Sequence, residues 1–300
     1  MAKEYISANV YCRRVFGCKA YKLALSAATT CPNRDGTVGI GGCTFCSTGG
    51  SGDFAASAAL PIARQIEEAK KRLGPKGEGL QHIAYFQSFT GTHGDLSRLE
   101  QRYTEAARQP DIVGLSIATR PDCLGPEALA MLVRLAAMKP LWVELGLQTI
   151  HAKTAKRINR CYELPVYEKA IQDLGKLGVH RITHVIFGLP GESREQMLET
   201  VRYAGPRTDG IKLQLLHVLE GTALAESYRR GEFEVLEPKA YYTLVADALE
   251  VLPPHVVVHR LTGDGAKRDL IAPLWSADKK RVLADLNRVL RQRGIYAVPE

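Results

Sequence analysis

Residues 31–46 read CPNRDGTVGIGGCTFC and carry three cysteines, Cys31, Cys43 and Cys46, which are separated by eleven and two residues. The segment directly follows the first predicted strand, and its four glycines let the backbone wrap closely around a metal centre. Ordinary iron–sulfur clusters and structural zinc take four ligands, so a set of three leaves one coordination position open for chemistry. The alternative interpretation is a zinc site completed by a distant histidine or by Cys12 or Cys18.

The composition indicates a folded, soluble protein with a sizeable core. Of 300 residues, 45% are hydrophobic and 24% are charged, and a mass of 33.0 kDa fits either two domains or one large α/β barrel. The sequence has no apolar run near the roughly 18 residues that a membrane span needs, and its start lacks a secretory signal. We therefore expect a cytoplasmic protein without a membrane partner. Because the cytosol is reducing, we expect its seven cysteines to serve as metal ligands, nucleophiles or core side chains and not as disulfide partners.

The charge balance predicts an anionic partner. A net charge of +8 and a pI near 9.1 favour a polyanion such as nucleic acid. A basic terminal helix is predicted over 279–293, and a second basic stretch (Arg13, Arg14, Lys19 and Lys22) precedes the cysteines. We expect the two stretches to form one surface leading to the ligand site. The alternative is that the charge only keeps the protein soluble.

Short β-branched runs alternate with helical stretches along the chain, which is typical of βαβ units and a parallel sheet. Six strands are predicted, at 22–26, 83–87, 113–118, 141–147, 182–187 and 211–218. Five helices are predicted, one between each pair of consecutive strands, at 62–73, 96–108, 126–138, 166–177 and 193–204. Right-handed crossovers wind such strands into a doubly wound sheet or an open barrel, and both folds bind ligands at the carboxyl ends of the strands.

The pattern changes after Gly221, where a helix over 241–252, an apolar run at 256–258 and the basic terminal helix follow. We interpret this part as an extension packed on the barrel. The expected organisation is therefore a basic N-terminal segment over 1–20, an α/β barrel over 21–222 and a C-terminal helical extension over 223–300.

The cysteine segment resembles that of radical S-adenosylmethionine (radical SAM) enzymes, because the aromatic Phe45 precedes the last cysteine. The first gap is wider than the usual three residues, as is typical of the branch that contains the catalytic subunit of Elongator. Four further segments are similar to that branch: ATRPD at 118–122, VELGLQT at 143–149, HVIFGLPGE at 184–192 and IKLQLLHVLEGT at 211–222. The opening is most similar to that of short, stand-alone bacterial radical SAM proteins.

The resemblance implies a partial (β/α)6 barrel whose three cysteines hold a four-iron four-sulfur (4Fe–4S) cluster. In that family the fourth iron chelates SAM, which is cleaved to methionine and a 5′-deoxyadenosyl radical. Residues at the strand ends are then expected to contact SAM together with Phe45, and they are Gln87, Ser88, Thr119, Arg120, Gln148, Gly188 and Glu192.

Two charged residues inside apolar strands are candidates for catalysis, although each also has a structural interpretation. Glu144 is either a functional group in the barrel or the partner of a buried cation. Within the barrel, Lys212 could meet either a substrate or Glu144. His151, His184 and His217 are more often core residues than proton carriers. The other cysteines are interpreted as small core side chains, namely Cys12, Cys18, Cys123 and Cys161.

The favoured function is a radical SAM enzyme that modifies tRNA at the C5 substituent of a wobble uridine, with a flavodoxin-type or ferredoxin-type reductant as a second partner. One alternative is a radical SAM enzyme acting on a small molecule or a peptide. The other is a non-catalytic, metal-binding RNA-binding protein. No acetyltransferase-like segment follows the barrel, so acetyl-CoA chemistry is not expected, and the sequence does not indicate an oligomeric state.

Overall fold

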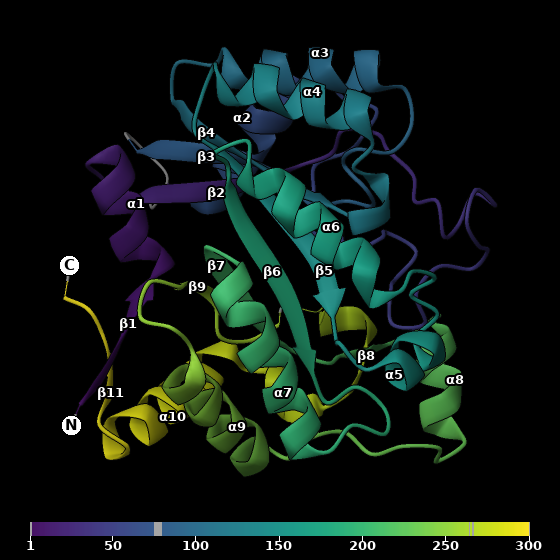
Figure 1. Cartoon of the computed structure of the whole chain (residues 1–300), viewed down its shortest axis with the longest axis vertical. Helices are drawn as coiled ribbons and strands as arrows, with labels where there is room; N and C mark the ends of the chain where they lie inside the picture. The colour runs from purple at the N-terminus through teal and green to yellow at the C-terminus, as the bar shows by residue number, and fades with distance from the viewer. Residues whose placement is uncertain (1, 75–79, 264, 266, 300) are drawn as a thin grey trace.

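The computed structural model describes residues 2–74, 80–263, 265 and 267–299 (Figure 1). Its main sheet has nine strands in the order β11–β1–β9–β7–β6–β5–β4–β3–β2, and all neighbouring pairs run parallel. These strands are β1 (Lys3–Ser7), β2 (Ala20–Leu25), β3 (Gln81–Phe86), β4 (Ile112–Thr119), β5 (Leu141–Gln148), β6 (His180–Phe187), β7 (Gly210–Leu215), β9 (Val257–Arg260) and β11 (Ile295–Ala297).

Strands β2 to β7 lie side by side in chain order without a reversal, which is the winding of an open barrel and not of a doubly wound sheet. Side chains of non-adjacent strands meet on the inner face, because Lys22 of β2 contacts Glu144 of β5. Such contacts require the sheet to curl. The six strands therefore form the expected partial (β/α)6 barrel, and helices cover its outer face (Figure 1): α2 (Ile62–Leu73), α3 (Leu96–Ala107), α4 (Pro126–Ala136), α6 (Leu164–Gly175) and α7 (Arg194–Ala204).

The predicted helices and strands are confirmed with end points that differ by a few residues, with one exception. The run predicted as a single strand over 211–218 is two strands, because the chain leaves the barrel after Leu216 donates to Phe187 O at 2.9 Å. The second piece, β8 (Val218–Leu219), pairs antiparallel with β10 (Leu270–Ala272) in a small separate sheet.

The C-terminal part contains the two expected helices, α9 (Pro238–Val251) and α10 (Lys279–Gln292), and also strands that extend the barrel sheet. Strand β1 lies between β9 and β11, so both ends of the chain join the sheet on its β7 side, beyond β9 (Figure 1). The main sheet therefore contains strands from each of the three expected parts of the chain, residues 1–20, 21–222 and 223–300. Further elements are α1 (Ala8–Phe16), α5 (Ala152–Arg157), α8 (Ala223–Arg229) and the short 3₁₀ turns η2 (Pro121–Cys123), η3 (Gly205–Arg207), η4 (Lys267–Asp269) and η5 (Leu274–Ala277).

Helix α1 covers the N-terminal end of the barrel strands. Its Tyr11 stacks on His180 with ring centroids 4.4 Å apart and lies 5.7 Å from the ring of Trp142, and these two residues stand at the starts of β6 and β5. The expectation that the Arg13–Lys22 stretch forms a surface leading to the ligand site is therefore wrong. Arg13 and Arg14 belong to α1, at the end of the barrel away from the carboxyl ends of the strands, and Lys22 points into the barrel.

The main hydrophobic core lies between the outer face of the sheet and the helices that cover it. In α2, for example, Ile62, Ile66 and Ala69 are buried because they recur on one face of the helix. Across the described ranges we find no helix with both the length and the apolar character that crossing a membrane requires.

Candidate functional site

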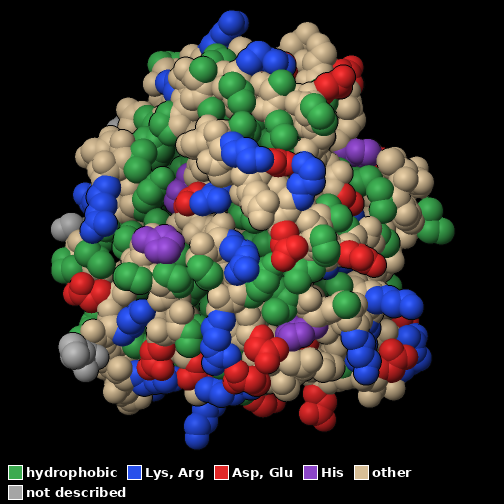
Figure 2. Space-filling model, in the orientation of Figure 1, with side chains coloured by type: hydrophobic (Ala, Val, Ile, Leu, Met, Phe, Trp, Pro, Cys, Tyr) green, Lys and Arg blue, Asp and Glu red, His purple; other side chains and the backbone are tan. Residues whose placement is uncertain are grey.

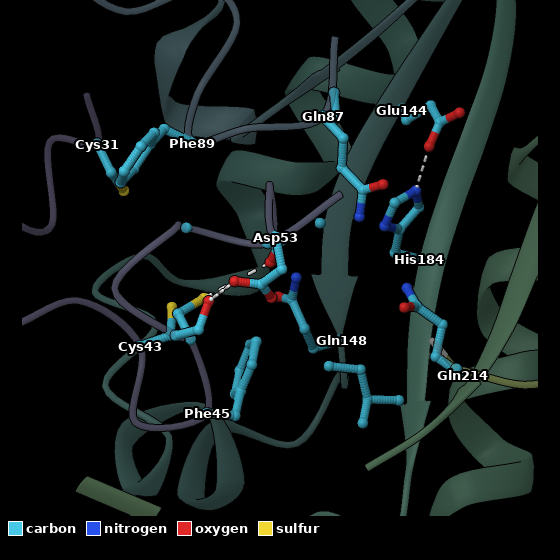
Figure 3. Close-up of a pocket in the computed structure, with 18 of the residues that line it drawn as sticks. Cys31, Cys43, Phe45, Asp53, Gln87, Phe89, Glu144, Gln148, His184 and Gln214 are labelled. Carbon is cyan, nitrogen blue, oxygen red and sulfur yellow. Dashed lines mark hydrogen bonds and ion pairs between the residues drawn. The ribbon is translucent and has the colours of Figure 1, made fainter. Parts of the chain in front are cut away.

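A cavity of about 400 Å³ opens where the carboxyl ends of β2 to β7 meet the cysteine loop, which we define as residues 31–46. Figure 3 shows Cys31, Cys43 and Phe45 on one side of it, and Glu144 and His184 on the other. Gln87, which follows β3, and Gln148, the last residue of β5, lie between these two sides, and Gln214 of β7 lies beside His184. The cavity therefore has a sulfur end and an opposite polar end.

The three expected cysteines line this one cavity. A hydrogen bond from the Cys43 thiol lowers the pKa of Cys46, and the nearby Arg34 guanidinium contributes in the same direction. The same contact, together with burial, raises the pKa of Cys43 well above its usual range. A thiolate is the form of cysteine that binds metals, so Cys46 is the thiol of this pair that more readily takes the ligating form. Among the described residues, the three sulfurs and the nearby histidines and carboxylates form no group of three suited to a single metal ion.

The cysteine loop is held in shape by its own polar side chains. The Arg34 guanidinium donates to the carbonyl oxygens of Cys46, Ser47 and Thr48 at 3.1, 2.6 and 3.3 Å. Gly42 has a φ of +80°, and a Cβ atom there would lie 2.7 Å from Arg34 Nε. The close approach of the guanidinium to the backbone therefore requires glycine at this position.

A second loop, residues 158–161, supports the cysteine loop from outside the barrel. The fully buried Asn33 amide donates to Asn159 O at 2.5 Å and to Cys43 Sγ at 3.7 Å. In return, Asn159 Nδ2 donates to Gly42 O at 2.8 Å. Cys161 lies on this loop, is exposed and donates to Asn159 Oδ1 at 3.2 Å. Asn33 therefore fixes one cysteine sulfur relative to a loop more than a hundred residues away.

At the polar end, Glu144 accepts hydrogen bonds from five side chains. Its Oε1 accepts from Lys22 at 2.6 Å and from Ser116 at 2.7 Å. Its Oε2 accepts from Tyr85 at 3.2 Å, from His184 at 2.6 Å and from Lys212. We call these residues the Glu144 network; each of the six barrel strands contributes one of them: Lys22, Tyr85, Ser116, Glu144, His184 and Lys212.

Burial and charge oppose each other in the Glu144 network. Burial alone would raise the pKa of Glu144, but Lys212 and Lys22 hold it well below its usual range, so the carboxylate is ionised. Burial lowers the pKa of Lys212 and of Lys22 despite the attraction of Glu144. Burial and the Lys212 charge also lower the pKa of His184 to about 4, so the imidazole is neutral at neutral pH.

The structure brings most of the expected site residues to the cavity. Besides the cysteines, the cavity is lined by Phe45, Gln87, Thr119, Arg120, Glu144 and Gln148. Asp122 fixes the Arg120 guanidinium through hydrogen bonds of 2.9 and 2.6 Å. Gln148 has a φ of +61°, and Gly146 leaves room for its amide because any side chain at Gly146 would collide with it.

Four expected residues lie outside the lining. Lys212 is buried behind Glu144, and Ser88 packs against Gly52. Gly188 donates to Met197 Sδ at 3.0 Å, and Glu192 accepts from Thr149. The last two therefore face α7 and the loop after β5 and do not reach the cavity.

Several lining residues were missed from the sequence, and alternation along the strands was the available signal. From the sequence we assign Lys22 to a basic surface. Lys22 lines the cavity together with Ala24, which lies two positions later on the same face of the strand. Tyr85 lies two residues before Gln87 in the same way, and Gln214 lies two residues after Lys212. His184 was interpreted as an ordinary core histidine, whereas it lines the cavity. His151 instead bonds to Gln196 O at 2.9 Å on the outer side of the barrel.

Comparison with known proteins identifies the family. Residues 29–204 match the family model of the radical SAM superfamily, and residues 208–292 match the radical SAM C-terminal domain. Protein YtqA of Bacillus subtilis is 44% identical over 98% of this chain and 92% of its own, and protein YhcC of Escherichia coli K12 is 35% identical over 94% and 91%.

More distant relatives match part of their length. A tRNA uridine(34) acetyltransferase of Dehalococcoides mccartyi is 30% identical over 65% of this chain and 42% of its own. The structure of archaeal Elp3 from Methanocaldococcus infernus superposes with a TM-score of 0.67 over 78% of this chain and 59% of that chain at 20% identity, which shows a shared fold. The family models and the close bacterial relatives together show that the chain belongs to the radical SAM superfamily.

Proposed function

We propose that this protein is a radical SAM enzyme that modifies tRNA at the C5 substituent of a wobble uridine. The observation that carries the proposal is the cavity itself, in which three cysteines from one loop face a polar network built from all six barrel strands. Cys31, Cys43 and Cys46 would hold a 4Fe–4S cluster. When bound, this cluster and SAM supply the 5′-deoxyadenosyl radical that removes a hydrogen atom from the substrate.

The donor set fits such a cluster on three points. The three thiols line one cavity, the pKa of Cys46 is lowered, and Cys43 Sγ accepts a hydrogen bond from the buried Asn33 amide. Amide hydrogen bonds to cysteine sulfur are a usual feature of iron–sulfur sites and tune their reduction potentials. Hydrogen bonds from Arg34 and Asn159 already hold the backbone of the cysteine loop, so little further ordering of the loop is needed when the cluster binds.

Residues at the sulfur end of the cavity would bind SAM. Phe45 and Gln148 lie toward that end (Figure 3), and Arg120 interacts electrostatically with Cys43 and Cys31. Together with Thr119, which also lines the cavity, they offer a ring face, an amide, a guanidinium and a hydroxyl. Glu144 and Lys212, which the sequence suggested as catalytic residues, would act as positioning residues. Glu144 holds Lys22 and His184, which themselves line the cavity, and Lys212 holds Glu144.

Two observations support tRNA as the substrate. Some relatives carry names that refer to tRNA uridine 34 and to Elongator complex protein 3. The mouth of the cavity also continues into a second hollow, which shares Asp53, Phe54, His217, Gly263 and Gly265 with the cavity and is rimmed by Lys267, Arg268 and Lys279. These three residues, which we call the mouth cations, lie where the phosphates of an incoming RNA would pass.

The rest of the expected basic surface contributes less. On α10, Asp285 pairs with Arg288 and lies 3.7 Å from Arg281, so part of that helix is neutralised by its own acid. Figure 2 shows Lys and Arg side chains interspersed with Asp and Glu over the lower part of the molecule. Arg268 is itself paired with Asp269 at 3.1 Å, so the mouth cations are the better test of RNA binding because they rim the hollow next to the cavity, and not because they lack acidic partners. A flavodoxin-type or ferredoxin-type protein would supply the electron.

The test is anaerobic reconstitution with iron and sulfide, followed by reduction, addition of SAM and measurement of 5′-deoxyadenosine. Replacing Cys31, Cys43 or Cys46 by Ala should remove both the bound iron and SAM cleavage. The matched controls are Cys12→Ala and Cys161→Ala, which should keep both. Tight binding of zinc at the three thiols with no uptake of iron would refute the enzyme proposal. An enzyme that cleaves SAM but modifies no base in any tRNA would refute the proposed substrate.

A further inference from the structure

His184 connects the Glu144 network to the cavity. Its Nε2 lies 2.6 Å from Glu144 Oε2, while the ring itself lines the cavity. Figure 3 shows the ring between Glu144 and the open centre of the cavity, on the side away from Cys31 and Cys43. The imidazole therefore has one nitrogen committed to the network and one that is available to a ligand.

The network also decides which nitrogen of His184 carries the proton. Glu144 is ionised and can only accept, so Nε2 donates its hydrogen to the carboxylate. Burial is the main reason that the imidazole is neutral, and the positive charges of Lys212 and Arg260 act in the same direction. A neutral imidazole with its proton on Nε2 has a lone pair on Nδ1. His184 thus presents a fixed hydrogen-bond acceptor to the cavity.

Gln214 provides the adjacent contact. It lies on β7, the strand next to β6, and its side chain lines the same part of the cavity (Figure 3). Its amide has no hydrogen-bond partner within the part of the chain that the structure describes, so it can donate and accept. Small residues on other strands, Ala24, Ala118 and Gly146, leave the space in front of these two side chains open.

We propose that His184 and Gln214 bind the imide edge of a uracil base, with the base N3–H donating to His184 Nδ1 and an adjacent carbonyl accepting from the Gln214 amide. The proposal rests on the proposed function and names the residues that recognise its substrate. Cytosine would be rejected, because its N3 is an acceptor and would face the lone pair of Nδ1. An anionic group would be rejected at Nδ1 for the same reason. Because Glu144 keeps the proton of His184 on Nε2, Nδ1 stays an acceptor at neutral pH.

The test compares anticodon stem-loop RNAs that differ only at the wobble base, which is uridine, 3-methyluridine or cytidine. Binding is measured at one fixed salt concentration, so that the phosphate contribution is the same for all three. We expect the wild-type protein to bind the uridine RNA about tenfold or more tightly than either of the others, because each leaves a buried polar group unpaired.

Two variants of His184 separate recognition from structural support. His184→Gln places an amide near the position of Nε2 and keeps a donor to Glu144, but it removes the acceptor at Nδ1. His184→Asn places an amide near Nδ1 and loses the bond to Glu144. We expect His184→Gln to abolish discrimination between the uridine and 3-methyluridine RNAs and His184→Asn to retain part of it. Thermal unfolding of both variants checks that the fold is intact.

Three outcomes would overturn the inference. The first is a wild-type protein that binds all three RNAs equally. The second is a His184→Gln variant that discriminates as the wild type does. The third is a His184→Gln variant whose affinity for SAM, measured without RNA, falls while discrimination between RNAs persists, because His184 would then contact the cofactor. If no RNA binds, the proposed tRNA substrate is refuted as well. If all three RNAs bind tightly and SAM cleavage is normal, only the inference about His184 and Gln214 is refuted.

Discussion

Replacing Glu144 by Gln should destabilise the protein by about 3 kcal/mol at pH 7, within the range of roughly 3–5 kcal/mol for removing one partner of a buried ion pair. The substitution keeps the shape of the side chain and removes its charge. Glu144 accepts from five donors, and two of these are the ammonium groups of Lys22 and Lys212. The variant therefore leaves two positive charges inside the barrel without a counter-charge.

The structure places the expected effect at the lower end of that range. The Lys22 side chain is 25% exposed and its ammonium lies 4.4 Å from the Tyr85 ring centroid and 4.9 Å from that of Trp142, so water and ring faces relieve part of its charge. The Lys212 side chain is 3% exposed, so water gives its charge almost no relief, and only the Tyr85 ring, whose centroid lies 4.6 Å from its ammonium, faces it in the same way. Because burial already holds its pKa well below the usual range, Lys212 can lose its proton in the variant, which limits the loss of stability.

The assay is urea unfolding of the wild type, Glu144→Gln, Lys212→Met and the double variant. We expect the double variant to be more stable than Glu144→Gln by about 1–2 kcal/mol, because it removes the stranded charge that causes most of the loss. The control is Glu67→Gln, which removes an exposed partner of Arg64 at 2.7 Å and should leave the unfolding curve unchanged. A Glu144→Gln variant as stable as the wild type, or strictly additive single effects, would refute this account of the network.

Three further predictions follow from particular contacts. The pKa of His184 falls from 6.5 in the unfolded chain to about 4 in the folded protein, so the unfolded chain binds its proton first as the pH is lowered. The free energy of unfolding should therefore drop between pH 6.5 and pH 4, by up to about 3 kcal/mol from this residue, and His184→Gln should make the pH dependence shallower. Replacing the mouth cations Lys267, Arg268 and Lys279 by Ala should lower the slope of log affinity for tRNA against log salt by about 2–3, whereas Arg13→Ala with Arg14→Ala should not change it. Gly42→Ala should destabilise the cysteine loop by about 1–2 kcal/mol, because φ is positive there and the new Cβ would press on Arg34, and the reconstituted protein should hold less iron.

Each of these three has an outcome that would contradict it. An unchanged pH dependence in His184→Gln would mean that another group, such as His180, whose pKa burial also lowers to about 4, dominates acid unfolding. Equal salt slopes for the mouth variant and the Arg13 and Arg14 variant would mean that RNA does not pass the mouth cations. Full iron content in Gly42→Ala would mean that Arg34 does not need to approach the loop backbone so closely.

The sequence alone determined the features that depend on neighbours along the chain. The spacing of Cys31, Cys43 and Cys46, together with the glycines between them, predicts one loop that carries three ligands. The periods of apolar residues placed the strands and helices of the barrel, because side chains repeat every two residues in a strand and every 3.6 in a helix. The bounds of α2, Ile62–Leu73, could be predicted to the residue.

The tertiary structure decided which of these residues meet. Alternation puts Lys22 and Glu144 on one face of their strands, but only the curl of the sheet brings residues 122 apart in the chain within 2.6 Å. The same curl gives His184 its carboxylate partner and its place in the cavity, which a lone histidine in a strand does not indicate. Strands β1 and β11 have three to five residues each, too few for a periodic signal, and they form because each pairs with the other at the edge of the sheet. That pairing also places α1, with Arg13 and Arg14, at the end of the barrel opposite to the cysteines. The sequence did not indicate this, because the position of charges along a chain does not say which end of a barrel they will cover.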